Sequence, residues 1–151
     1  MNNVVVVLGA NKDQPLAIMR ANEKIKRVFE VNSSSNVYLS ESEVLGDSAK
    51  YINIALSIQT ELSQTHIEKE IKQIEAELNK FKNKWIDIDP ILIENNNGDT
   101  IFLHSKLFVY CHFLITLNDV LKNKSIQNKY VPDVLAKHPN RHFFEQLEIE
   151  L

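Results

Sequence analysis

The sequence has 151 residues, of which 44% are hydrophobic and 25% charged, and its formal net charge is −3. This size and composition predict one soluble globular domain over residues 1–151, and the acidic balance argues against a nucleic-acid partner. The apolar run Val4 to Leu8 is too short to cross a membrane, and the lone Cys111 excludes an internal disulfide framework and favours a cytoplasmic setting.

The first part of the chain predicts a strand, a helix and two more strands. Residues 4–8 (VVVVL) are typical of a buried strand, which Gly9-Ala10-Asn11 is expected to end. Pro15 fits the first turn of a helix with apolar residues every three or four positions. Residues 32–39 predict a polar edge strand. Residues 51–60 predict a strand with one face in the core, because apolar residues alternate there: Ile52, Ile54, Leu56 and Ile58.

A second helix and a fourth strand follow. The helix is indicated by an apolar stripe at helical spacing: Ile67, Ile71, Ile74 and Leu78. Thr65 and Glu68 offer a capping box at its start. Residues 82–98 supply the strand, and Asn95 to Asp99 predict a turn after it.

The order of these elements is β-α-β-β-α-β. That order predicts an α+β, ferredoxin-like fold, in which two helices pack on one face of an antiparallel sheet. Beyond residue 100 the pattern is weaker. Leu107 to Leu121 predict one more helix, within a C-terminal extension of the core.

The fourth predicted strand carries an unusual pair of aspartates. Asp87 and Asp89 lie two positions apart and therefore share one face, which leaves the other face to apolar residues: Ile86, Ile88 and Leu92. Aspartates are poor strand formers and costly to bury side by side. Taken alone, such a pair is more typical of an exposed strand edge or a helix-cap pair than of a metal site. Tyr51 and Asn53 lie on the non-core face of their own strand, so this sheet face is predicted to be polar.

Several segments, in this order, resemble the 6-hydroxymethyl-7,8-dihydropterin pyrophosphokinases of folate synthesis. They are LGANKDQPL (8–16), YLSESEVLGDSAKYIN (38–53), LSQTHIEKEIKQIE (62–75), WIDIDPILI (85–93) and LHSKLFVYCHFLITLNDV (103–120). The second segment resembles the family's Y-x-T-x-P…Y/F-x-N stretch, and the fourth its D-x-D strand. The order and spacing of the segments carry the resemblance more than any one of them does.

The resemblance implies a transfer of diphosphate from ATP to the hydroxymethyl group of a pterin, with Mg²⁺ between Asp87, Asp89 and the ATP phosphates. Mg²⁺ prefers oxygen ligands of this kind, and the chain has no glycine-rich phosphate loop that would hold a nucleotide instead. The roles implied are catalysis by Lys84, Asp87 and Asp89, pterin binding by Ser40, Tyr51, Asn53 and Phe113, and nucleotide binding by Glu75, Lys80 and His104. If the polar sheet face is the site, Ser40, Tyr51, Asn53, Asp87, Asp89 and His104 should converge on one cleft.

The chain departs from the family before the D-x-D strand and after His104. Residues 79–84 (NKFKNK) are shorter than the family's arginine-rich loop and carry only lysines, which lack the planar bidentate grip of arginine on phosphate. The family's later arginine falls on Tyr110, and its pterin-stacking phenylalanine falls on His112, next to Phe113. These departures leave two alternatives: a non-catalytic module that binds nucleotide or pterin, and a ferredoxin-like regulatory or scaffold domain. The sequence leaves the oligomeric state open.

Overall fold

The computed structural model describes residues 1–13, 15–44, 46–80 and 86–149. The core elements are β1 (Asn2–Asn11), α1 (Pro15–Val28), β2 (Glu30–Ser34), β3 (Val37–Glu41), β4 (Lys50–Thr60), α2 (Gln64–Asn79) and β5 (Asp87–Glu94). With β2 and β3 as two parts of one strand, this is the predicted order. The extension holds β6 (Thr100–Leu103), α3 (Cys111–Val120), β7 (Ser125–Ile126), β8 (Lys129–Tyr130), α4 (Val131–Ala136), a 3₁₀ turn (Arg141–Phe143) and β9 (Phe144–Leu147).

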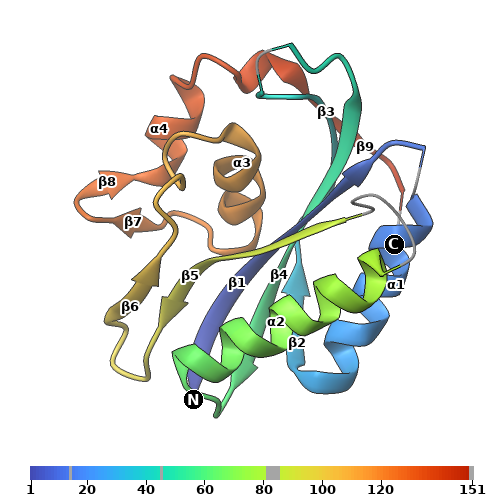
Figure 1. Ribbon diagram of the computed structural model, residues 1–151. Coiled ribbons are helices and arrows are strands. Elements are labelled where there is room, and N and C mark those ends of the chain that lie inside the picture. The colour runs from blue at the N-terminus through green and yellow to red at the C-terminus, as the bar shows by residue number, and fades with distance from the viewer. Residues whose placement is uncertain (14, 45, 81–85, 150–151) are drawn as a thin grey trace.

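The main sheet has the strand order β6-β5-β1-β4-β3-β9. β2 and β3 pair with different parts of the same edge of β4. Every pairing within the described residues is antiparallel. In Figure 1, α1 and α2 lie together on one side of the sheet, and α3 and α4 lie on the other side. The ferredoxin-like fold is therefore confirmed, with the extension covering part of the second sheet face. Among the described residues, no helix combines the length and apolar character needed to span a membrane.

The core under α1 and α2 contains the residues predicted for it. The alternating residues of β4 and the apolar stripe of α2 are buried in one cluster. Burial of one such side chain contributes about 1.5–3 kcal/mol. The predicted capping box was wrong by two residues, because extended Ser63 is the N-cap of α2 and its hydroxyl accepts a hydrogen bond from the His66 amide. Thr65 lies inside the helix.

A β-bulge changes the face assignment along β5. The pairing with β1 shifts at Ile91, because neighbouring β1 residues pair with Pro90 and with Leu92. A bulge reverses the inside–outside alternation beyond it, and Pro90 lacks the amide that a regular ladder needs. The prediction that Leu92 shares a face with Ile88 was therefore wrong. Leu92 packs on the opposite face, and Ile93 joins Ile88 under α1 and α2.

Two strand boundaries also differ from the predicted ones. β1 runs through Gly9 and ends at Asn11, since it pairs with β5 as far as Gly9 and with β4 as far as Asn11. The strand predicted at residues 32–39 is divided at Ser35, whose amide and hydroxyl both bond the Ala55 backbone. β9 pairs with β3, so the second half of that segment is not a sheet edge.

The second sheet face is polar at its two ends, because Tyr51 and Asn53 of β4 lie at one end and Ser57 and Gln59 of the same strand lie at the other. Over the rest of this face, α3 and α4 cover a second apolar core that includes Val5, Ala55, Leu92, Leu114 and Leu117. The uncovered end lies where β1, β3, β4 and β5 carry polar or small side chains. This end forms the candidate site.

Candidate active site

The uncovered end of the sheet forms a cleft of about 550 Å³. All six side chains predicted to converge line this cleft, together with Phe113: Ser40, Tyr51, Asn53, Asp87, Asp89 and His104. The convergence that the sequence predicted is therefore confirmed. Residues from four strands, from the loop between β3 and β4, and from the segment between β6 and the first turn of α3 build its walls.

Strand register brings the polar residues together. On β1, Gly9 pairs with Asn53 on one side and with Asp87 on the other. Directly paired residues point to the same sheet face, and two strand spacings separate Asn53 from Asp87 by about 10 Å. A Cβ on Gly9 would lie 3.5 Å from the Asn53 side-chain oxygen. The missing side chain thus keeps the space between the amide and the carboxylate open.

Asn53 is buried and oriented by its neighbours on β3. Its side-chain amide nitrogen donates to the Ser40 hydroxyl over 2.9 Å and to the Tyr38 carbonyl over 3.5 Å. The side-chain oxygen lies beside Gly9, at the cleft. Asn53 therefore presents a fixed acceptor to a ligand with amide-like donors, which is the chemistry of a pterin edge.

Tyr51 is held by an acidic residue that the sequence analysis did not single out. Its hydroxyl donates to Asp47 over 2.6 Å. This hydrogen bond, with some burial and the charges of Asp47 and Asp87, raises the pKa of Tyr51 to about 12. The same hydrogen bond lowers the pKa of Asp47. Tyr51 is therefore a neutral, fixed ring at the cleft wall.

The aspartate pair lies at the start of β5, and Glu75 supports the backbone between the two. From α2, Glu75 accepts a hydrogen bond from the Ile88 amide over 2.7 Å. Burial raises the pKa of Glu75, and the charges of Asp87 and Asp89 raise it further, against the bond from Ile88. Glu75 does not line the cleft. Its contact is with the strand that carries the aspartates.

The aspartate pair fits Mg²⁺ that is shared with a polyphosphate. Among the described residues, no group of three or more His, Cys, Asp or Glu side chains could hold a metal. Mg²⁺ is usually bound by one or two carboxylates, with phosphates and waters as its other ligands, so Asp87 and Asp89 suffice as the protein's share. Exposed Lys80 follows α2 and is not part of the cleft lining. Lys84 lies outside the described residues.

His104 lies between β6 and α3 and lines the cleft next to Phe113. Its Nδ1 accepts a hydrogen bond from the Lys106 amide over 3.0 Å, so the neutral ring carries its proton on Nε2. The ring meets Phe113 edge-on, with centroids 4.9 Å apart. His104 thus has a donor available for a ligand in the cleft.

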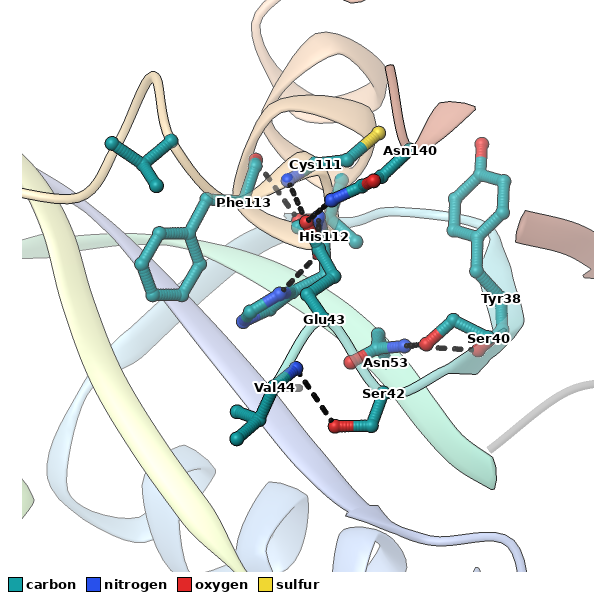
Figure 2. A network of polar contacts seen from close by, with 12 residues as sticks. Tyr38, Ser40, Ser42, Glu43, Val44, Asn53, Cys111, His112, Phe113 and Asn140 are labelled. Atoms are coloured by element: carbon teal, nitrogen blue, oxygen red, sulfur yellow. Dashed lines mark hydrogen bonds and ion pairs between the residues drawn. The ribbon is translucent and has the colours of Figure 1, made fainter. Parts of the chain in front are cut away.

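A buried glutamate at the cleft was missed by the sequence analysis. Glu43 lies between β3 and β4, and its carboxylate accepts hydrogen bonds from the Cys111 and His112 amides, the His112 ring and the Asn140 side chain (Figure 2). Burial alone would raise the pKa of Glu43, but these hydrogen bonds outweigh it and lower the pKa to about 2. No local pattern in the sequence marks Glu43, because its partners at Cys111, His112 and Asn140 lie far away along the chain.

Comparisons with known proteins agree with the geometry. A family model described as 7,8-dihydro-6-hydroxymethylpterin-pyrophosphokinase matches residues 5–133. The chain is 30% identical over 101 residues to the 2-amino-4-hydroxy-6-hydroxymethyldihydropteridine pyrophosphokinase of Aquifex aeolicus, and the match covers 63% of each protein.

Solved structures share the fold. A wild-type Plasmodium falciparum HPPK-DHPS structure with pterin and p-hydroxybenzoate has a TM-score of 0.75 and 12% identity, and the match covers 98% of this chain and 47% of that one. An HPPK-DHPS structure in complex with substrates has a TM-score of 0.79 at 12% identity, with 98% and 47% covered. The chain therefore spans about half the length of these structures and less than two thirds of the curated relative.

Proposed function

Because the chain belongs to the 7,8-dihydro-6-hydroxymethylpterin-pyrophosphokinase family, we propose that it transfers diphosphate from ATP to the hydroxymethyl group of 6-hydroxymethyl-7,8-dihydropterin in folate biosynthesis. The observation that carries the proposal is the row Asn53–Gly9–Asp87 across three strands, with both polar side chains lining one cleft. Asn53 would accept hydrogen bonds from the pterin, and the aspartate pair would bind the ATP phosphates through Mg²⁺. The separation of about 10 Å between Asn53 and Asp87 would hold the two substrates close enough to react with each other.

The pterin end of the cleft is formed by Ser40, Tyr51, Asn53 and Phe113. The Ser40 hydroxyl accepts a hydrogen bond from the side-chain nitrogen of Asn53. The side-chain oxygen of Asn53 is then left to accept hydrogen bonds from donors on the pterin edge. The Tyr51 and Phe113 rings supply apolar faces for a flat heterocycle. Binding here would orient the hydroxymethyl group toward the aspartates.

The phosphate end is formed by Asp87 and Asp89, which would hold Mg²⁺ together with the ATP phosphates. When bound, Mg²⁺ neutralises phosphate charge, which is the main requirement of phosphoryl transfer. His104 would donate from Nε2 to the nucleotide. Glu75 would act on the nucleotide end through the Ile88 amide, and Lys80 with Lys84 would add positive charge.

A non-catalytic module that binds nucleotide or pterin is the second candidate. The observation in its favour is the absence of arginine from residues 79–84, together with tyrosine at position 110, where the family has arginine. Lysine keeps the charge but not the bidentate geometry that grips a transferring phosphate. Such a module would still bind both ligands through the cleft.

One experiment separates the two candidates. Calorimetric titration with Mg²⁺ and a non-hydrolysable ATP analogue, with and without 6-hydroxymethyl-7,8-dihydropterin, measures binding, and AMP release from ATP with the same pterin measures transfer. Joint binding with AMP release supports the enzyme. Joint binding without AMP release supports the module. If neither the ATP analogue nor the pterin binds, both candidate functions are contradicted.

A further inference from the structure

We propose that Glu43 is a positioning residue that fixes the aromatic wall of the cleft, and that the C-terminal segment around Asn140 is part of this wall's support. This inference rests on the proposed function, because it assigns the wall to pterin binding. Glu43 is suited to the role by its burial, since its side chain is only 4% exposed. A buried carboxylate that accepts several charge-assisted hydrogen bonds is stiff and specific.

Glu43 caps the start of α3. Within the described residues, Tyr110 at the N-cap makes no side-chain capping bond, and the first turn has no acidic residue. The amides at a helix start need acceptors, and a negative charge is favourable there. Glu43 supplies both, because its two oxygens accept from Cys111 over 2.8 Å and from His112 over 2.9 Å. The loop between β3 and β4 thereby caps a helix on the other side of the cleft.

Glu43 also holds the His112 ring. The Glu43 oxygen that accepts the His112 amide also contacts the His112 Nδ1, at 2.9 Å. The ring stacks on Tyr110, with centroids 5.3 Å apart and planes 26° apart, and lies 4.4 Å from the Phe113 ring. His112 and Phe113 both line the cleft. Glu43 therefore sets the orientation of one wall ring directly, and that ring contacts the next.

The C-terminal segment bonds to the same carboxylate. The Asn140 side chain donates to Glu43 over 3.0 Å, although Asn140 does not line the cleft. The Asn140 amide donates to the Nδ1 of His138, whose Nε2 donates to the Val109 carbonyl just before α3. The C-terminal segment thus holds both Glu43 and the approach to α3. Figure 2 shows Asn140 and Cys111 meeting the carboxylate from the side away from the His112 ring.

If these contacts fix the cleft wall, their loss should change pterin affinity and not only the stability of the fold. A wall that is fixed before the ligand arrives spares the ligand the cost of ordering it. Loss of Glu43 or Asn140 should therefore weaken pterin binding, while the ATP end, formed by other residues, should be unaffected. His112 should at the same time lose its fixed Nδ1 proton.

The test uses E43Q and N140A, with E145Q, at the exposed Glu145 of β9, as a matched loss of one glutamate charge. We expect the Kd for 6-hydroxymethyl-7,8-dihydropterin, measured with Mg²⁺ and a non-hydrolysable ATP analogue, to rise on the order of tenfold in E43Q and a few-fold in N140A. The Kd of the ATP analogue alone should stay at the wild-type value. ¹⁵N NMR of the His112 ring should show loss of the Nδ1-protonated form in E43Q, and E145Q should match wild type throughout.

The outcomes separate this proposal from the function on which it rests. Wild-type pterin affinity in both variants, with lowered melting temperatures, would mean that the network only stabilises the fold and would overturn the proposal. If the wild-type chain binds no pterin, the proposed function is wrong and the wall assignment falls with it, whatever the ring spectrum shows. Should E43Q fail to fold, N140A decides, because its side chain lies outside the cleft.

Discussion

Single carboxylates connect distant parts of this chain. Glu43 bonds to residues 68 and 97 positions away, and Asp119 on α3 accepts from the Tyr38 hydroxyl, 81 positions away. Each such carboxylate satisfies amide or hydroxyl donors that would otherwise be buried without a partner. The sequence identified the aspartates of the cleft because they interrupt an apolar strand. It did not identify Glu43, because its partners are far away along the chain and only the fold brings them near.

The low pKa of Glu43 predicts acid sensitivity. Its pKa falls from an ordinary 4.5 to about 2 in the folded protein. A lowered pKa stabilises the folded state above pH 4.5, and that stabilisation is lost as the pH falls toward 2. The contribution is at most about 3 kcal/mol. We expect the free energy of unfolding of the wild type, from urea titrations between pH 5 and 2.5, to fall more steeply than that of E43Q. Parallel slopes would show that Glu43 is not held ionised.

At the scale of elements, the register of β1 between β4 and β5 makes the cleft. Alternation in residues 51–60 predicted the core face of β4 correctly, because that strand is regular along its length. Alternation also predicted the shared face of Asp87 and Asp89, because β5 is regular there, before its bulge. Alternation failed at Leu92, because the bulge at Ile91 depends on how β5 pairs with β1. The local sequence pattern does not show which residues of two strands pair.

Gly9 offers a test at this scale, because it separates the two ends of the cleft. In Gly9→Ala the new Cβ would lie at ordinary contact distance from Asn53, so the fold should tolerate it. Gly9→Val would place two methyl groups in the same space, and β-branched residues suit strands. We expect a melting temperature near wild type for both variants, and a larger loss of pterin affinity by calorimetry for valine than for alanine. Equal affinity for wild type and Gly9→Val would show that the ligand does not pass between Asn53 and Asp87.

The molecule as a whole has two apolar cores, one on each face of the sheet. The core under α1 and α2 was predictable, because the spacing of apolar residues in long helices and in a regular strand shows which face is buried. The second depends on short elements, such as the two-residue strands β7 and β8 and the six-residue α4, whose patterns are too brief to predict. The cleft could be predicted because it lies on the strands. On the wall that closes it, His104 and Phe113 were expected from the family resemblance. The hydrogen bonds of Glu43 that hold this wall could not be predicted, because they join residues far apart in the sequence.

Ligand binding should stabilise the whole fold through the aspartates. A ligand that binds only the folded state raises the melting temperature. We expect Mg²⁺ with a non-hydrolysable ATP analogue to raise it for the wild type, by differential scanning fluorimetry, and to leave the double variant Asp87→Asn, Asp89→Asn unchanged. Lys84→Ala should keep most of the rise, because it removes phosphate-directed charge and not a metal ligand. A full response in the double variant would show that the aspartates hold no metal.

The pairing of β3 with β9 bears on how the protein folds during synthesis. Val37 pairs with Leu147, 110 residues later, so β3 leaves the ribosome long before its outer partner exists. Contacts between such distant residues form slowly, and an unpaired strand edge is open to other chains meanwhile. β3 carries Ser40, and Glu43 follows it, held in part by Asn140. Both the outer edge of the sheet and the support that Asn140 gives to the cleft wall therefore form only after most of the chain has been synthesised.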